Sequence, residues 1–390
     1  VFASCRNDFF DSTASLDMKR PLEEQGDDSQ KNPIVFLDFT VDDEKVGRVV
    51  LELFKNVAPR TVENFRALCT GEYGTGLNGK PLHYKGSIIH KVIPQCMIQG
   101  GDIINFDGSG GESIYGPHFE DESFEKKNTE AGYLVMVNEG SRNSNSSQFV
   151  ITSIPCPHLD ETNVVFGKVL KGMGIVTELN EVPTIKDVIR IVDCGELGQG
   201  KSWGLEEEDG TADVYPPWPD DWDHDLFVDK LDNVYMGNVV MRIKDSGNHY
   251  FSKKDYIVAE RKYKKALRYI DWMAKLKDLI KQPGAIDPAE LKVQTLSNLA
   301  AVKLKRDQYR EALKICNKVL DLDRKNCKAM YRRGLAQMGL NEHQLALRDM
   351  KQALEGMPNN KQIIREMDKV NKVIQSYLVY EKKICSKMFK

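Results

Sequence analysis

The pattern of apolar and polar positions changes about halfway along the chain. In the first part, short apolar runs alternate with turn-forming residues, and residues 34–40 and 47–54 read as a hairpin around a turn at 42–44. Between about 70 and 195 the chain is rich in glycine, and further short apolar runs lie between turn signals. Short strands at this density predict a closed β-barrel rather than a helical fold.

From about residue 236 the pattern becomes helical and repeats. Small residues spaced by 12 and then 7 positions occur three times, as Gly247, Ala259 and Ala266, as Ala300, Ala312 and Val319, and as Gly334, Ala346 and Ala353. The second and third triplets are 34 residues apart, which is the period of tetratricopeptide (TPR) repeats. The first triplet precedes the second by 53 residues, which places an insertion of 19 within 271–290. The pattern therefore predicts three TPR repeats over 236–358, stacked as an all-α superhelix.

Three further segments are predicted to flank or connect these two parts. Residues 359–390 continue as a helix with an apolar stripe of Ile363, Met367, Val370, Ile374 and Tyr377. We expect this helix to cap the last repeat, and a basic amphipathic target for calmodulin is the alternative. Residues 197–235 are acidic and read as a linker, in which Trp218 and Trp222 offer surface for packing. Residues 1–32 are predicted to be a disordered extension, with Met18 as the biological start or within a native tail.

Composition and charge narrow the function classes. The net charge of −3 gives no reason to expect nucleic-acid or membrane-surface binding. No apolar stretch approaches the roughly 20 residues that span a bilayer, and the first thirty residues carry no secretory signal. Eight cysteines without a Cys-x-x-Cys pair favour reduced thiols and a cytoplasmic location. Neither the cysteines nor the histidines show metal-ligand spacing, so no metal and no cofactor is predicted.

Several segments over about 33–196 resemble the cyclophilin family of peptidyl-prolyl isomerases. They are 86–102 (GSIIHKVIPQCMIQGGD), 110–116 (GGESIYG), 145–149 (NSSQF), 157–160 (PHLD) and 164–167 (VVFG). The resemblance implies an eight-stranded closed barrel capped by two helices, with proline-containing client polypeptides as substrates. His158 in place of the usual tryptophan, and the loop over 70–86, are similar to the cyclophilin-40 type, in which TPR repeats follow the barrel.

The resemblance also implies an isomerase site, and this sequence departs from the family pattern there. The implied catalytic residues are Lys91, Met97, Gln99 and Asn138, and the implied proline pocket consists of Cys96, Gln148, Val150, His158, Leu159 and Asn163. Lys91 stands in place of an arginine and lacks the planar guanidinium fork. Cys96 and Val150 stand in place of phenylalanines, and Asn163 in place of a histidine. We therefore expect weak or absent isomerase activity and poor cyclosporin binding.

Five polar residues occupy equivalent positions in the predicted repeat helices. They are Lys244, Asn248, Asn298, Lys328 and Arg332. Residues four apart share one helix face, and stacked repeats line a concave groove, so these side chains should converge there. The set is similar, residue by residue, to the carboxylate clamp of TPR co-chaperones, which implies binding of the acidic C-terminal tail of heat-shock protein 90 or its 70-kDa counterpart. The alternatives are an inactive proline-binding module and a structural adaptor for another acidic tail.

Overall fold

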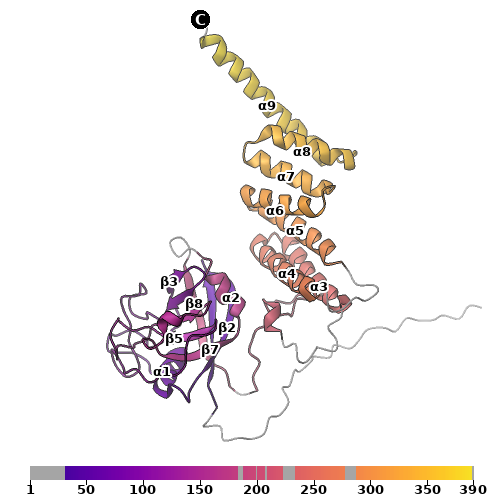
Figure 1. Ribbon diagram of the computed structural model, residues 1–390. Helices are drawn as coiled ribbons and strands as arrows, with labels where there is room; N and C mark the ends of the chain where they lie inside the picture. The colour runs from indigo at the N-terminus through magenta and orange to yellow at the C-terminus, as the bar shows by residue number, and fades with distance from the viewer. Residues whose placement is uncertain are drawn as a thin grey trace, which may run out of the picture. The chain divides into compact units, whose positions relative to one another are not determined.

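The computed structural model describes residues 31–182, 188–198, 200–206, 209–222, 233–276 and 287–388 (Figure 1). The chain divides into two units, Val1–Trp203 and Gly204–Lys390. The predicted extension, including Met18, lies outside the described residues up to position 30.

Among the described residues, eight antiparallel strands form the sheet of the first unit, in the order β3-β4-β6-β5-β7-β2-β1-β8. They are β1 (Ile34–Val41), β2 (Glu44–Leu53), β3 (Ile89–Ile93), β4 (Met97–Gly100), β5 (Tyr133–Met136), β6 (Phe149–Thr152), β7 (Val165–Lys171) and β8 (Ile189–Glu196). The two edges meet just before β3, where Ile191 N donates to Ser87 O at 2.9 Å and Gly86 N donates to Ile191 O at 2.7 Å. The sheet is therefore a nearly closed barrel, as the sequence predicts.

Two helices cover the barrel, α1 (Pro59–Thr70) and α2 (Met173–Leu179). Helix α1 begins at Pro59, whose fixed φ suits the first helical position, and ends at Gly71, whose φ of 71° suits a left-handed cap. Phe65 of α1 packs against Phe149 and Phe166 with ring centroids 5.2 Å apart in both pairs. Side chains thus fill the barrel interior, and a binding site must lie on the outer face of the sheet.

The second unit is a stack of helices. It contains α3 (Asn233–Ser252), α4 (Tyr256–Leu276), α5 (Pro288–Lys305), α6 (Tyr309–Leu322), α7 (Cys327–Gly339), α8 (His343–Gly356) and α9 (Lys361–Met388). Each helix contacts the next one, and α5 also contacts α3 and α7. The predicted small residues lie at the crossings, since a Cβ on Gly247 would lie 2.7 Å from the Tyr263 ring. The TPR-like arrangement is therefore present, although 277–286 of the predicted insertion lie outside the described residues.

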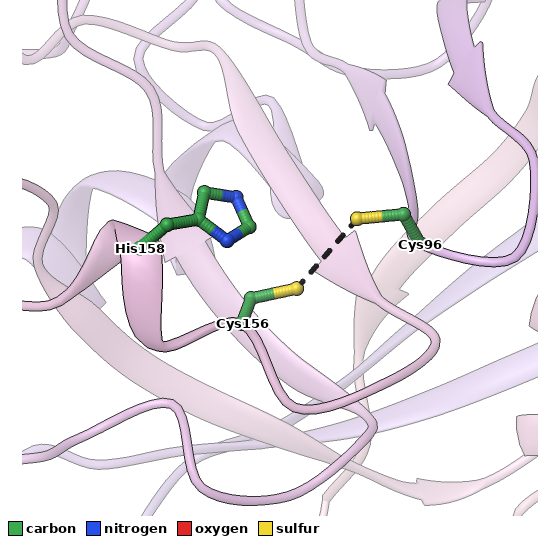
Figure 2. Close-up of side chains that lie close together, drawn as sticks. All are labelled: Cys96, Cys156 and His158. Carbon is green, nitrogen blue, oxygen red and sulfur yellow. Dashed lines mark hydrogen bonds between the residues drawn. The ribbon is translucent and has the colours of Figure 1, made fainter.

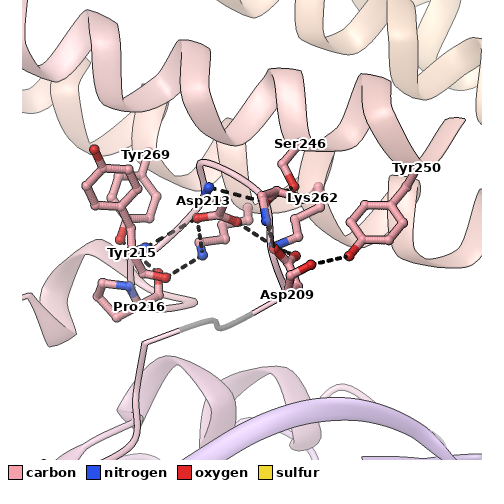
Figure 3. A network of polar contacts seen from close by, with 10 residues as sticks. Asp209, Asp213, Tyr215, Pro216, Ser246, Tyr250, Lys262 and Tyr269 are labelled. Atoms are coloured by element: carbon pink, nitrogen blue, oxygen red, sulfur yellow. Dashed lines mark hydrogen bonds and ion pairs between the residues drawn. The ribbon is translucent and has the colours of Figure 1, made fainter. Parts of the chain in front are cut away.

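Part of the predicted acidic linker packs on α3 and α4 (Figure 3). Asp213 is completely buried, and its carboxylate accepts hydrogen bonds from Nζ of Lys262 and Nζ of Lys265, each at 2.7 Å. Tyr215 and Trp222 are buried in the apolar cluster between these helices. The described residues from 204 to 222 therefore belong to the second unit, whereas their composition indicated a linker. The acidic side chains of this segment pair with buried lysines of α4. This pairing explains why a segment with the composition of a linker packs on the helices.

Helix α9 continues the stack over its first half. Ile363 and Val370 are completely buried against Met350 and Ala353 of α8. Tyr377, which belongs to the same predicted stripe, is 53% exposed. Over the described ranges, no helix has both the length and the apolar character that crossing a membrane requires.

Candidate functional site

The predicted catalytic residues come together through strand register. Lys91 of β3 lies opposite Gln99 of β4, Gln99 lies opposite Val150 of β6, and Val150 lies opposite Val135 of β5. Directly opposite residues of antiparallel strands share a face. Phe149 points into the barrel, so Val150, the next residue, points outwards. The row from Lys91 to Val135 therefore lies on the outer face of the sheet.

An apolar surface adjoins this row. Val150, which is 5% exposed, clusters with Phe54, Tyr133, Val135 and Val165, and Met97 and Leu159 pack against the cluster while partly exposed. Three predicted site residues, Met97, Val150 and Leu159, thus form one apolar surface. Sequence reasoning missed Phe54 and Tyr133, because they lie in segments that carry no family motif and reach this surface only once the sheet has formed.

Gln99 and Gln148 have fixed amide orientations. Gln99 Nε2 donates to Gln148 Oε1 at 3.0 Å, and Gln148 Nε2 donates to the carbonyls of Gly108 and Gly110 at 2.8 and 2.7 Å. Because both N–H groups of Gln148 are occupied by backbone, its oxygen must face Gln99. The pair therefore presents a pre-oriented polar group next to Lys91, which is itself exposed.

Asp102 holds the loop that supports Gln148. Its carboxylate accepts hydrogen bonds from five backbone N–H groups between residues 104 and 110. Burial alone would raise the pKa of Asp102, but these hydrogen bonds outweigh it and lower the pKa to about 2. Asp102 therefore supports the loop behind the site from a completely buried position.

The two predicted asparagines are tied to the backbone at the rim. Asn138 Nδ2 donates to the carbonyl of Thr162 at 2.7 Å, and Asn163 Nδ2 donates to the carbonyl of Met136 at 3.0 Å. These bonds link the end of β5 and the residues that follow it to the segment before β7. Both amides thus have backbone partners that fix their orientation.

Cys96 and His158, both predicted pocket residues, lie beside a third residue that sequence reasoning missed (Figure 2). Cys96 Sγ lies 3.8 Å from Cys156 Sγ, and all three potential ligand atoms lie within 4.8 Å of one another. Burial raises the pKa of the Cys156 thiol to about 12, and the contact with Cys96 adds to this shift. Cys96 and Cys156 are 60 positions apart, so the search for local metal-ligand spacing overlooked a cluster that the fold assembles.

The predicted clamp residues lie on the first helix of each pair, namely α3, α5 and α7. Asn298 Nδ2 donates to Asn248 Oδ1 at 3.0 Å, which joins α5 to α3. Arg332 Nη1 donates to the carbonyl of Ser297 at 2.8 Å, which joins α7 to α5. Lys244 Nζ donates to Gln294 Oε1 at 3.0 Å, and Lys328 is exposed one turn before Arg332. The five side chains therefore lie along three helices, of which α3 contacts α5 and α5 contacts α7.

Arg332 and the adjacent Arg333 differ in the charged groups that lie beside them. Burial lowers the pKa of the Arg332 guanidinium, whose ordinary value is high enough that it stays charged. Arg333 pairs with Asp349 at 2.6 Å, whereas no carboxylate of the described residues forms an ion pair with Arg332. A partly buried cation without a carboxylate partner among the described residues is costly, and an anionic ligand would reduce that cost.

Sequence reasoning also missed two polar neighbours of Asn248. The hydroxyl of Tyr263 on α4 donates to Asn248 Oδ1 at 2.7 Å, and Asn248 Nδ2 donates to Asp245 Oδ1 at 3.0 Å. No repeat position marks Tyr263, because it comes from the second helix of the pair. Its hydroxyl reaches Asn248 only after the two helices have packed.

Comparisons with known proteins match both units. Residues 36–196 match the sequence model of the family described as cyclophilin type peptidyl-prolyl cis-trans isomerase/CLD. The chain is also similar to peptidyl-prolyl cis-trans isomerase D of Mycosarcoma maydis, with 37% identity over 391 residues that cover 92% of this chain and 97% of that protein. The similarity thus extends beyond the barrel through the helical unit.

Proposed function

Because this chain belongs to the cyclophilin-type peptidyl-prolyl cis-trans isomerase family and has the two-part architecture of cyclophilin-40, we propose that it is a co-chaperone. Its barrel binds proline-containing segments of client polypeptides and isomerises them weakly. Its helical unit binds the acidic C-terminal tail of heat-shock protein 90 or its 70-kDa counterpart. The free cysteines of the described residues fit a reducing compartment such as the cytoplasm.

The isomerase chemistry is rotation about an X–Pro bond. Amide resonance sets a barrier of about 18–20 kcal/mol. A site lowers this barrier by holding the proline ring and by favouring the twisted, less conjugated amide. A fixed donor near the prolyl nitrogen helps, since it binds the twisted state better than the planar one. Lys91 is the cation in this position, and the Gln99–Gln148 pair supplies fixed polarity beside it.

The apolar surface supports proline binding more strongly than catalysis. Val150, Met97 and Leu159 offer a surface for the proline ring. The ammonium of Lys91 lies on an exposed, flexible side chain, so it is less preorganised than a guanidinium would be. Loss of one preorganised donor typically costs about 10²–10³ in rate. We therefore keep a binding module without turnover as the second candidate function.

The observation that carries the chaperone proposal is the charge environment of Arg332. A terminal carboxylate placed against Arg332, Lys328 and Lys244 would make charge-assisted hydrogen bonds. It would also supply Arg332 with the counter-charge that no carboxylate of the described residues provides. Asn248 and Asn298 are already joined by a hydrogen bond, so they would hold their amides in place for a peptide backbone.

A peptide titration tests this proposal. A fluorescent peptide that ends in Glu-Glu-Val-Asp, the C-terminal sequence that carboxylate clamps hold in these two heat-shock proteins, is titrated with the full-length chain, and anisotropy gives the affinity. We expect Lys328→Ala and Arg332→Ala each to weaken binding at least about tenfold, in line with the loss of a charge-assisted hydrogen bond. Lys325→Ala is the matched control, because Lys325 is an exposed lysine close to Lys328. Unchanged affinity in the Arg332→Ala variant would reject the chaperone proposal.

A further inference from the structure

We propose that Cys96, Cys156 and His158 form a binding site for a soft divalent metal ion, with Zn²⁺ as the best-fitting occupant. The site lies where β4 begins and where the short 3₁₀ helix Pro157–Leu159 follows β6. This inference goes beyond the proposed co-chaperone function, because it needs neither isomerase activity nor a chaperone partner.

The separation of the two sulfurs fits tetrahedral coordination. Cys96 Sγ and Cys156 Sγ lie 3.8 Å apart. Two thiolates at about 2.3 Å from one zinc ion, at the tetrahedral angle, are themselves about 3.8 Å apart. A single ion therefore fits between the sulfurs without any movement of either one.

The imidazole lies close enough to complete a three-ligand set. Its ligand atom lies within 4.8 Å of both sulfurs, and Figure 2 shows the ring on the same side as the two thiols. Zinc coordination requires a separation of about 3.6 Å between nitrogen and sulfur, so His158 has to approach each sulfur by at most about 1.2 Å. His158 is exposed on a three-residue helix, and rotation of its side chain provides this movement.

The backbone holds both cysteines in position. Cys96 N donates to the carbonyl of Ile93 at 3.0 Å, and its carbonyl accepts from Ser153 N at 2.7 Å. Cys156 N donates to the carbonyl of Asn128 at 3.0 Å. Because the backbone of both cysteines is fixed before any metal binds, an ion would find the two sulfurs already in place.

The donor set selects the kind of metal. Two thiolates and one imidazole suit zinc and other soft or borderline ions, whereas magnesium and calcium prefer oxygen ligands. Three protein ligands leave one position of a tetrahedron open, as in catalytic zinc sites. Cys156 is buried while His158 is exposed, so the open position faces solvent and takes water or another small ligand.

Cobalt titration of the full-length chain tests the site. The protein is reduced with a phosphine and freed of metal, and Co²⁺ is then added. The parent is the Cys327→Ser, Cys385→Ser variant, which lacks two thiols outside the first unit, of which Cys385 is exposed. We expect one equivalent of Co²⁺ to give thiolate-to-cobalt charge-transfer absorption and d–d bands of tetrahedral intensity. One equivalent of Zn²⁺ should abolish both.

Single substitutions then assign the ligands. Cys96→Ser, Cys156→Ser and His158→Ala should each weaken Co²⁺ binding at least about 100-fold, since even outer-shell changes cost about 10–100-fold. His249→Ala is the control histidine, because His249 is exposed on α3 in the other unit. His158 is itself exposed, so His158→Ala remains informative if a serine variant does not fold.

Two results would overturn the proposal. One is a tetrahedral cobalt spectrum that persists in the Cys156→Ser variant. The other is a reduced chain that takes up no cobalt while air oxidation joins Cys96 to Cys156, because this pair would then be a disulfide couple. Neither readout depends on isomerase turnover or peptide binding, so failure of the metal site is separable from failure of the co-chaperone proposal.

Discussion

Asp213 and Lys265 form a buried ion pair, with Nζ of Lys265 2.7 Å from Oδ1 of Asp213. The other carboxylate oxygen pairs with Lys262 at 2.7 Å, and Lys262 also pairs with Asp209. A segment outside the repeat helices thus supplies the counter-charge for two lysines of α4. The helical unit therefore depends on residues that precede its first helix.

Removing the carboxylate of Asp213 should destabilise the helical unit strongly. The Asp213→Ala variant removes the carboxylate that pairs with both Lys262 and Lys265, and breaking a buried ion pair typically costs about 3–5 kcal/mol. Urea unfolding followed by helical circular dichroism measures the change. Asp220→Ala is the control, because Asp220 belongs to the same segment but is exposed. Equal midpoints for the two variants would show that the buried ion pairs of Asp213 add no stability.

Glu260 should make the stability of the helical unit depend on pH. Its carboxylate pairs with Lys303 and Arg306, each at 2.7 Å. Burial alone would raise the pKa of Glu260, but the hydrogen bond from Lys303 and the charge of Lys264 outweigh burial and lower the pKa to about 2. A depressed pKa stabilises the folded state above the unfolded value of about 4.3, and this contribution is lost as pH falls towards 2.

The Glu260→Gln substitution tests this linkage. At pH 7 it should lower the free energy of unfolding by about 3 kcal/mol, and the difference should shrink as pH falls below about 4.3. Urea titrations at several pH values measure the effect. Glu311→Gln is the control, because Glu311 also pairs with Lys303 but is half exposed. A difference between Glu260→Gln and the unaltered chain that stays constant from pH 7 to pH 3 would contradict the assignment.

Restoring the family pattern at the isomerase site should raise turnover. The restored variant carries Lys91→Arg, Cys96→Phe, Val150→Phe and Asn163→His. Recovery of a preorganised donor should raise the exchange rate of an X–Pro peptide by about 10²–10³. Exchange between the cis and trans forms is measured by NMR with catalytic amounts of full-length protein. Equal rates would mean that the natural site is already an efficient isomerase.

The sequence predicted the elements whose signals are local or periodic. Alternating apolar positions indicated the strands, and the register of those strands then brought Lys91, Gln99 and Val150 into one row. The spacing of small residues indicated the helix crossings, because a residue such as Gly334, where a Cβ would lie 3.1 Å from the Ala346 carbonyl, leaves no room for a side chain. Both patterns, the alternation of apolar positions and the spacing of small residues, can be found in the sequence because regular secondary structure fixes where the residues concerned lie.

The sequence did not predict features that arise only when distant segments meet. Asp213 looks like a solvated acid by composition, and its burial follows from two lysines about 50 residues away. Cys156 becomes a neighbour of Cys96 through the pairing of β4 with β6, so no local motif indicates the cluster. Among the described residues no carboxylate pairs with Arg332, and this too is a property of packing, since the adjacent Arg333 does have a partner.

Tyr263 should act as a positioning residue for the clamp. Its hydroxyl donates to Asn248 Oδ1, the same oxygen that accepts from Asn298, so it helps to orient the Asn248 amide. Tyr263→Phe keeps the ring against Gly247 but removes this bond. Because one such bond contributes about 0.5–1.5 kcal/mol, affinity for the acidic peptide should fall by about 2–13-fold.

Tyr309→Phe is the matched control for this change. It also removes one hydroxyl hydrogen bond, to Asp307 at 2.6 Å, but Asp307 is not a clamp residue, whereas the partner of Tyr263 is. Anisotropy titrations and thermal melts of both variants separate orientation from stability. If Tyr263 positions Asn248, its variant loses affinity at an unchanged melting temperature. A parallel loss of affinity in Tyr309→Phe would instead mean that both hydroxyls act through the stability of the helical stack.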